Sequence, residues 1–282
     1  MSQAIPPELR QWIVEQAQAG HSAESVLRSM KAAGWDEDVA IQAMEDTLRG
    51  HLNDQALAQG LPPAVPVPEP DVADSPLYLD GGDRQVAVLG TLALPRVVIL
   101  GGLLSDEECD ALIAAARPRL SRSLTVATAT GGQEVNADRT SQGMFFERGE
   151  SELTARIEAR IALLLNWPVA NGEGLQVLRY GPGTEYKPHY DYFDPEQPGT
   201  PTLLARGGQR VGTLVMYLSE PEKGGATTFP DVGLSVAPKR GNAVFFSYER
   251  AHPGTRTLHG GAPVLAGEKW IATKWLRERV FE

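Results

Sequence analysis

A proline-rich segment at residues 61 to 76 divides the chain into two parts that must fold differently. It contains six prolines, which fix the backbone φ angle and lack the amide hydrogen that helices and inner strands need. Such a segment is extended and semi-rigid, so it predicts an interdomain linker. We therefore expect a small domain at residues 1 to 60 and a larger domain at residues 77 to 282.

The first part carries apolar side chains at helical spacing over residues 5 to 52. Ser22 and Asp36 each precede such a run, and both residue types cap helix N-termini. The pattern predicts a small module of three helices. Its segment AAGWDEDVAIQAM resembles ubiquitin-associated-like modules, in which a Gly-Trp turn joins two helices. The resemblance implies that the module docks a protein partner, whereas a structural appendage or a dimer contact would explain the same pattern.

The larger part begins with β-type apolar runs and two helices, and then becomes rich in strands. Ser105 precedes three acidic residues and predicts a helix N-terminus, and this helix should extend to Ala116. A second helix is expected from Glu152 to Leu165. After Asn166, short β-type runs alternate with glycine-containing turns. About eight antiparallel strands with two preceding helices predict an α+β fold built on a double-stranded β-helix, or jelly roll.

Composition limits the partners and the location that we expect. A net charge of −10 and a pI near 5.1 argue against sequence-independent nucleic-acid binding, which needs a basic surface. No apolar run reaches the roughly 18 residues of a membrane span, and the N-terminus lacks a signal-peptide pattern. The single cysteine, Cys109, excludes an intrachain disulfide and is expected to be a packed helix residue rather than a nucleophile. These features predict a cytoplasmic protein.

One stretch of the strand-rich part carries the residue types of a metal site. His189 and Asp191 are two positions apart, and alternate side chains of a strand point to the same face. With the distant His259 they would provide two imidazoles and one carboxylate, the ligand set of non-haem Fe(II) oxygenases. Three protein ligands leave positions open for a cosubstrate and O2. A His-x-Asp pair alone is common by chance, so the surrounding sequence has to support this interpretation.

Further segments between residues 95 and 279 support it. They are PRVVILGGLLSDEECDALI, Arg139-Thr140-Ser141, LQVLRYGPGTEYKPHYDYF, GGQRVGTLVMYL, EKGGATTFP and LHGGAPVLAGEKWIATKW. In this order they resemble the prolyl 4-hydroxylase catalytic domain of the Fe(II)/2-oxoglutarate dioxygenase superfamily. The resemblance implies an enzyme that hydroxylates prolyl residues in a peptide or protein and releases succinate and CO2. It also implies Fe(II), 2-oxoglutarate and O2 as cofactors, together with ascorbate.

The resemblance assigns the central residues of the site one by one. It implies that His189, Asp191 and His259 bind the iron, and that Lys269 pairs with the distal carboxylate of 2-oxoglutarate. An ammonium is a suitable point charge for a buried carboxylate. His259 and Lys269 flank a predicted hairpin, so both side chains can face one pocket.

Four more residues are implied at the edge of this pocket. Tyr180 and Thr213 match residues that hydrogen-bond the cosubstrate. Trp275 matches an aromatic residue that lines the site. Arg139 and the polar segment at residues 128 to 142, expected to be a mobile loop, match the loop that closes on the peptide substrate. Ordinary structural roles also explain three of them: Tyr180 as a core residue, Thr213 as a strand residue, and Arg139 as a solvated loop charge.

Other functions are consistent with parts of this pattern. A dioxygenase that acts on a different residue or on a small molecule would use the same triad and lysine, because these define the cosubstrate and not the substrate. A zinc-dependent hydrolase would need a general base beside a bound water, and the sequence offers no obvious candidate. A non-catalytic protein-binding scaffold would be favoured by a missing ligand, and none is missing. A homodimer is compatible with the sequence.

Overall fold

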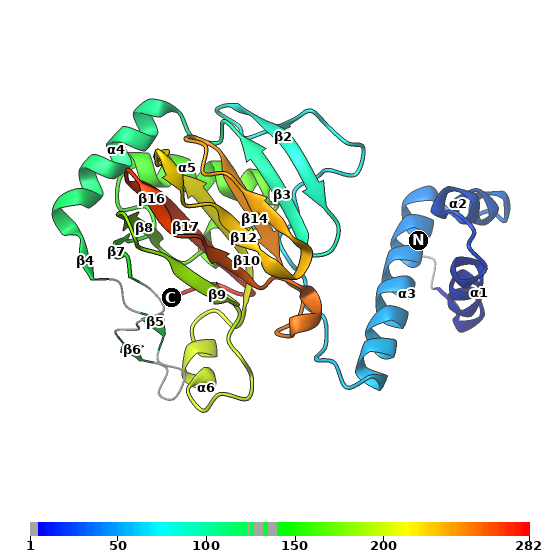
Figure 1. The fold of residues 1–282 in the computed structure, drawn as a ribbon. Helices are drawn as coiled ribbons and strands as arrows, with labels where there is room; N and C mark the ends of the chain where they lie inside the picture. Colours follow the sequence, from blue (N-terminus) through cyan, green and yellow to red (C-terminus); the bar gives the residue numbers. More distant parts are fainter. Residues whose placement is uncertain (1–4, 123–124, 127–131, 135–139) are drawn as a thin grey trace. The chain divides into compact units, whose positions relative to one another are not determined.

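The structure is a computed structural model of the chain, and it describes residues 5–122, 125–126, 132–134 and 140–282. The chain divides into two compact units, Met1–Ala64 and Val65–Glu282. Figure 1 shows a helical unit and a larger unit that contains the sheets. Within the described residues, no helix has the length and apolar character that crossing a membrane requires.

The first unit is a bundle of three helices, as predicted: α1 (Pro7–Gln18), α2 (Ala23–Ala32) and α3 (Glu37–Ala58). The Ser22 hydroxyl accepts the amide hydrogen of Ser25, and the Asp36 carboxylate accepts those of Asp38 and Val39, so both predicted caps form. The three helices share one apolar cluster, centred on Ile13, Val26, Met30, Ala40 and Met44. Because α3 continues beyond the predicted end near residue 52, the bundle reaches almost to the proline-rich segment.

Most of the proline-rich segment belongs to the second unit, which begins at Val65. The amide of Val65 donates to the Glu249 carbonyl at 2.9 Å, and that of Glu69 donates to the Leu165 carbonyl at 3.0 Å. Pro68 and Pro70 are buried. The segment is therefore extended, but residues 65 to 76, which the sequence assigned to a linker, lie against the sheet unit as a strap.

The second unit is built from two main antiparallel sheets. The larger has nine strands in the order β1 (Tyr78–Asp80), β2 (Gln85–Leu92), β3 (Arg96–Gly101), β14 (Ala243–Ser247), β10 (Arg210–Tyr217), β17 (Lys269–Arg277), β8 (Leu175–Tyr180), β7 (Gln142–Phe146), β4 (Ser121–Arg122). The smaller has four: β13 (Leu234–Val236), β12 (Thr227–Phe229), β15 (His259–Gly261), β9 (Tyr186–His189). Two further pairs are β11 (Lys223–Gly224) with β16 (Val264–Ala266) and β5 (Thr125–Val126) with β6 (Gln133–Glu134). The predicted α+β jelly roll is confirmed.

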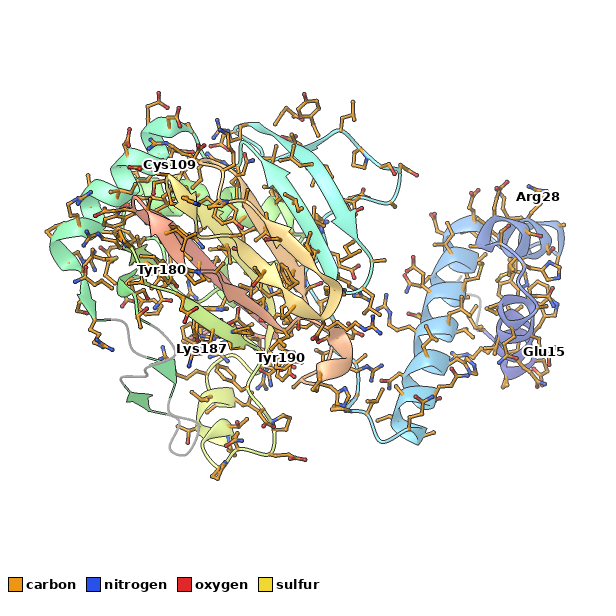
Figure 2. All side chains as sticks on the ribbon, viewed as in Figure 1. Glu15, Arg28, Cys109, Tyr180, Lys187 and Tyr190 are labelled. Atoms are coloured by element: carbon orange, nitrogen blue, oxygen red, sulfur yellow. The ribbon has the colours of Figure 1, made fainter. Side chains whose placement is uncertain are left out.

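Helices α4 (Asp106–Ala116) and α5 (Glu152–Leu164) cover one face of the larger sheet (Figure 1). Ser105 and Glu108 form a capping box at the start of α4, where the sequence predicted a cap. Cys109 of α4 is fully buried (Figure 2), and burial raises the pKa of its thiol to about 11. It is a packed residue, as expected, and burial disfavours the thiolate form that a nucleophile needs. A short helix, α6 (Thr200–Leu204), precedes β10.

Alternation along β17 separates the core from the site. Trp270, Ala272 and Leu276 belong to the apolar cluster under α4 and α5, whereas Ile271 belongs to the cluster that meets the smaller sheet. Lys274 points to the helix side, where its ammonium donates to the carboxylate of Glu158 and to a backbone carbonyl. A buried lysine on this face is therefore neutralised by a buried acid.

We expect the strap to contribute to the stability of the second unit. A chain beginning at Val65 should fold and melt as that unit does in the full chain, because its clusters are complete without the helical bundle. A chain beginning at Leu77 should be less stable by on the order of 2 kcal/mol, since it lacks the strap hydrogen bonds and the two buried prolines. Urea denaturation of both proteins measures the difference. Equal midpoints would show that the strap is only a linker.

Lys274→Met should destabilise the second unit by about 3–5 kcal/mol, because it leaves the buried Glu158 carboxylate without its partner. Lys239→Met is a matched control, since Lys239 pairs with Glu220 on the exposed surface and should leave stability nearly unchanged. Chemical denaturation at pH 7 checks both variants. A loss for Lys274→Met no larger than that for the control would contradict the buried ion pair.

Candidate active site

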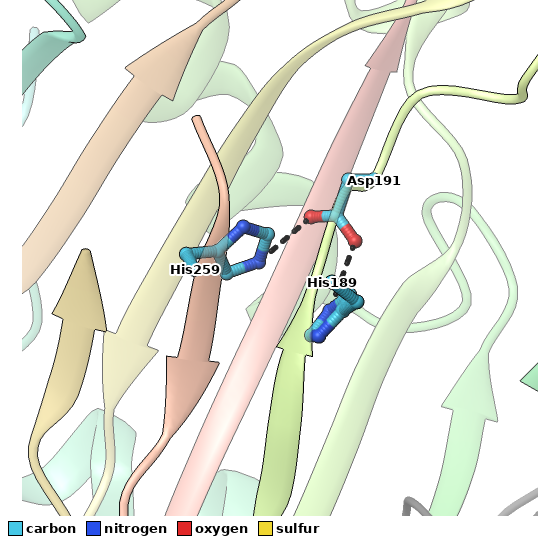
Figure 3. A group of neighbouring side chains, drawn as sticks. All are labelled: His189, Asp191 and His259. Atoms are coloured by element: carbon cyan, nitrogen blue, oxygen red, sulfur yellow. Dashed lines mark ion pairs between the residues drawn. The ribbon is translucent and has the colours of Figure 1, made fainter. Parts of the chain in front are cut away.

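His189, Asp191 and His259 come together at the margin of the smaller sheet (Figure 3). His189 ends β9 and His259 begins β15, and the two residues are directly paired across the strands. One ligand atom from each of the three residues can be chosen so that all lie within 4.8 Å of one another. The Asp191 carboxylate bridges the two rings, with Oδ1 3.5 Å from His189 Nε2 and Oδ2 3.4 Å from His259 Nε2.

Backbone carbonyls orient both imidazoles. His189 Nδ1 lies 2.8 Å from the Lys187 carbonyl, and His259 Nδ1 lies 2.9 Å from the Thr257 carbonyl. A carbonyl can only accept, so each Nδ1 carries the proton and each Nε2 keeps its lone pair facing Asp191. Each histidine thus uses the carbonyl two residues earlier to present Nε2 as a ligand atom.

The protonation states suit a cation. Burial lowers the pKa of His189, with a smaller contribution from His259, so the neutral ligand form is favoured. Burial alone would raise the pKa of Asp191, but the His259 and His189 rings, when protonated, hold it well below its ordinary value through their charge and hydrogen bonds. A bound cation would supply the same positive charge beside neutral rings. Two imidazoles and one carboxylate on one side of a cavity match the donor set of an Fe(II) facial triad. These three residues would hold the metal.

A cavity extends from the triad between the two sheets. Its walls come mainly from β8, β10 and β17, whose inward residues face the smaller sheet, and include Leu178, Tyr180, Thr213, Val215, Lys269, Ile271, Thr273 and Trp275. The residues of β9 and β15 form the opposite side, including Tyr186 and Gly260. The triad therefore lies at one side of a pocket that is otherwise largely apolar.

Lys269 is the one charged residue among the β17 side chains that line this pocket. It is only 3% exposed, and no carboxylate among the described residues pairs with it. Its ammonium lies 5.5 Å from the ring centroid of Tyr180 and 6.0 Å from that of Tyr217. Burial lowers the pKa of Lys269 to about 8. Unlike Lys274 on the other face of the strand, Lys269 needs an anion that the described part of the chain does not supply, and a ligand carboxylate would fit.

The structure places the other predicted site residues as follows. Tyr180 on β8 (Figure 2) lines the pocket and is paired in register with Lys269. Trp275 also lines it, with its ring 3.9 Å from the Arg210 guanidinium. Thr213 faces the pocket, but its hydroxyl donates to Asp191 Oδ2 at 2.7 Å. Of the segment at residues 128 to 142, residues 128–131 and 135–139, which include Arg139, lie outside the described residues. Contacts of these side chains with cosubstrate or substrate stay predictions.

Sequence reasoning missed the residues behind the metal ligands. The Tyr248 hydroxyl lies 3.0 Å from the Thr213 hydroxyl. Glu173 forms ion pairs with Arg210 and Arg277, and this buried group supports Trp275 from behind. The run AVFFSYE could have placed Tyr248 on the inner face by alternation, but no local pattern predicts which hydroxyl it meets across the sheet.

The jelly roll, the triad and the buried lysine together define an oxygenase that uses Fe(II) and 2-oxoglutarate. The family model of the 2OG-Fe(II) oxygenase superfamily matches residues 175–277. Prolyl 4-hydroxylase 5 of Arabidopsis thaliana is 40% identical over 222 residues, which cover 71% of this chain and 74% of that protein. Prolyl 4-hydroxylase 1 of the same plant is 43% identical over 203 residues, which cover 66% and 70%.

A solved structure agrees with these relatives. The viral collagen prolyl hydroxylase of Paramecium Bursaria Chlorella virus-1, solved as a 2-oxoglutarate complex, is 34% identical with a TM-score of 0.51. The match covers 64% of this chain and 95% of the viral chain. The chain therefore belongs to the prolyl 4-hydroxylase family of 2OG-Fe(II) oxygenases. The predicted family and the predicted cofactors Fe(II), 2-oxoglutarate and O2 are confirmed.

Lys269→Met should stabilise the protein when neither metal nor cosubstrate is bound. The folded-state pKa of about 8 lies below the ordinary value of 10.5, so the unfolded state binds more protons between these pH values. The stability of the unaltered protein should rise with pH across that window, and below it the lysine costs about 3 kcal/mol. Denaturation from pH 7 to 11 measures the difference, which should shrink towards zero near pH 10.5. A variant less stable than the unaltered protein at pH 7 would contradict an unpaired ammonium.

Proposed function

We propose that this protein hydroxylates prolyl residues in a peptide or protein, with release of succinate and CO2. The observation that carries the proposal is the pairing of the His189, Asp191 and His259 triad with the unneutralised Lys269 in one pocket. The donor set of the triad suits a divalent cation and the buried ammonium of Lys269 suits a carboxylate, so Fe(II) with a dicarboxylic keto acid fits both. The names of the Arabidopsis and viral relatives support proline as the target.

The bound cofactors supply the oxidising chemistry, in which O2 and 2-oxoglutarate are consumed as a C–H bond becomes C–OH and succinate and CO2 form. The chain supplies binding and orientation. Lys187 and Thr257 hold the two imidazoles in the ligand tautomer through their carbonyls. Lys269 binds the distal carboxylate of the cosubstrate, and Tyr180 lies on the same wall to hydrogen-bond it.

The apolar wall has a separate task. Leu178, Val215 and Ile271 line the same pocket as the triad and Lys269, so they exclude water from the cosubstrate. A low local dielectric strengthens the attraction between the Lys269 ammonium and the carboxylate. Trp275, whose ring packs against the Arg210 guanidinium, presents an aromatic surface at the pocket for the peptide. Arg139 completes the peptide contacts in this proposal.

The proposal assigns partner binding, and not catalysis, to the helical bundle. The bundle has its own apolar cluster, which supports a module that binds a protein partner and not a part of the catalytic core. A homodimer and a cytoplasmic location remain part of the proposal, as does ascorbate, which keeps the metal reduced. A partner for the bundle would help to deliver a protein substrate, whereas a short proline peptide would not need it.

We expect the protein to release succinate from 2-oxoglutarate with Fe(II) and ascorbate, faster when a proline-rich peptide is present. Mass spectrometry should show one added oxygen on a prolyl residue. His189→Ala and His259→Ala should abolish both products by removing ligands, and Lys269→Ala should mainly raise the 2-oxoglutarate concentration required. A matched peptide with alanine in place of proline is the control. Equal succinate release with both peptides, with no oxygen added, would count against prolyl hydroxylation but not against the oxygenase class.

A further inference from the structure

Asp191 is the metal ligand that the β-ladder does not hold. His189 and His259 are paired across β9 and β15, and each ring is fixed by a carbonyl. Asp191 comes after the last residue of β9, on a bend. Among the described residues, its backbone carbonyl meets only a long contact of 3.5 Å from Arg210. The position of its carboxylate must therefore be set by its side-chain contacts.

Two buried hydroxyls supply those contacts from the larger sheet. The Thr213 hydroxyl donates to Asp191 Oδ2 at 2.7 Å, because an ionised carboxylate can only accept. Its single hydrogen is then committed, so the Tyr248 hydroxyl 3.0 Å away must be the donor in the second bond. The order is thus fixed from Tyr248 to Thr213 to Asp191. Thr213 is fully buried and Tyr248 is 1% exposed, so bulk solvent hardly reaches either bond.

The hydrogen-bonded series from Tyr248 through Thr213 to Asp191, which we call the relay, is held by the strands of the larger sheet. Thr213 lies within β10, paired with Phe246 of β14 on one side and with Trp275 of β17 on the other. Tyr248 follows β14, and its amide donates to the Val211 carbonyl at 3.1 Å. Thr213 therefore stands on a central strand of the larger sheet and Tyr248 directly after the neighbouring strand, whereas the metal ligands belong to the smaller sheet and its margin.

We propose that Thr213 and Tyr248 are positioning residues of the metal centre. They hold Oδ2 by a directed hydrogen bond, so that Asp191 offers Oδ1 to the metal as a single, correctly aimed ligand atom. Without them, Oδ2 would keep only the His259 ring at 3.4 Å as a polar neighbour among these contacts, and the carboxylate could turn. The proposal rests on the metal role of Asp191. It assigns to Thr213 a contact different from the cosubstrate bond implied by its family resemblance.

Metal affinity in the full chain tests the relay without any turnover. Metal-free protein is titrated with Mn(II), and the free ion is followed by its electron paramagnetic resonance signal. Thr213→Val should weaken Mn(II) binding by about 10- to 100-fold, the usual effect of losing a group that orients a metal ligand. Tyr248→Phe should weaken it in the same direction by less. Thr213→Ser keeps the hydroxyl and should bind nearly as well as the unaltered protein.

The double variant distinguishes a relay from two separate effects. Because Tyr248 acts through Thr213, Thr213→Val combined with Tyr248→Phe should bind Mn(II) no more weakly than Thr213→Val alone. Tyr217→Phe is the matched control, since the Tyr217 hydroxyl donates to Thr227 at 2.9 Å, both residues are buried, and neither bond atom contacts Asp191. It should leave Mn(II) affinity unchanged.

Three results would overturn the relay: Mn(II) affinity of Thr213→Val equal to that of the unaltered protein, additive losses in the double variant, or an equal loss in Tyr217→Phe. If Thr213→Val fails to fold, Tyr248→Phe and Thr213→Ser still decide, since the relay requires weakened binding in the first and retained binding in the second. A failure of the metal site itself looks different. In that case the unaltered protein and His189→Ala would bind Mn(II) equally poorly.

Discussion

The strict alternation of side chains along β17 is the constraint on which both the core and the site depend. One face of this strand is buried under α4 and α5, and the other lines the pocket beside the triad. A shift of one residue in its pairing would move Trp270 into the pocket and Lys269 into the apolar core. The pairing with β10 on one side and β8 on the other excludes that shift. The register of β17 that builds the core therefore also builds the site.

Much of this could be predicted from local patterns in the sequence. Helix caps at Ser22, Asp36 and Ser105 depend on a few neighbouring residues, and the structure contains all three. The shared face of His189 and Asp191 follows from the period of a strand, although Asp191 lies just beyond the end of β9. The family resemblance, and not the pattern alone, connected these residues to His259 and Lys269.

What the sequence did not predict depends on contacts between distant segments. The prolines of residues 61 to 76 predict an extended chain, but not that Val65 and Glu69 would bond to Glu249 and Leu165. The Tyr248 hydroxyl meets Thr213 only because β14 and β10 pair in one particular register. Glu173, Arg210 and Arg277 form a charged group inside the unit, where each looks like a surface residue in the sequence.

The direct pairing of His189 with His259 has a consequence for motion. The smaller sheet consists of strands only three or four residues long, so few backbone hydrogen bonds oppose its local opening. A cation held by both histidines would join β9 to β15 with bonds much stronger than those of the ladder. Metal occupancy would then lower the rate at which the amide hydrogens of these two strands exchange with solvent, while those of the nine-stranded sheet would change little. The metal would stabilise the smaller sheet as well as take part in the reaction.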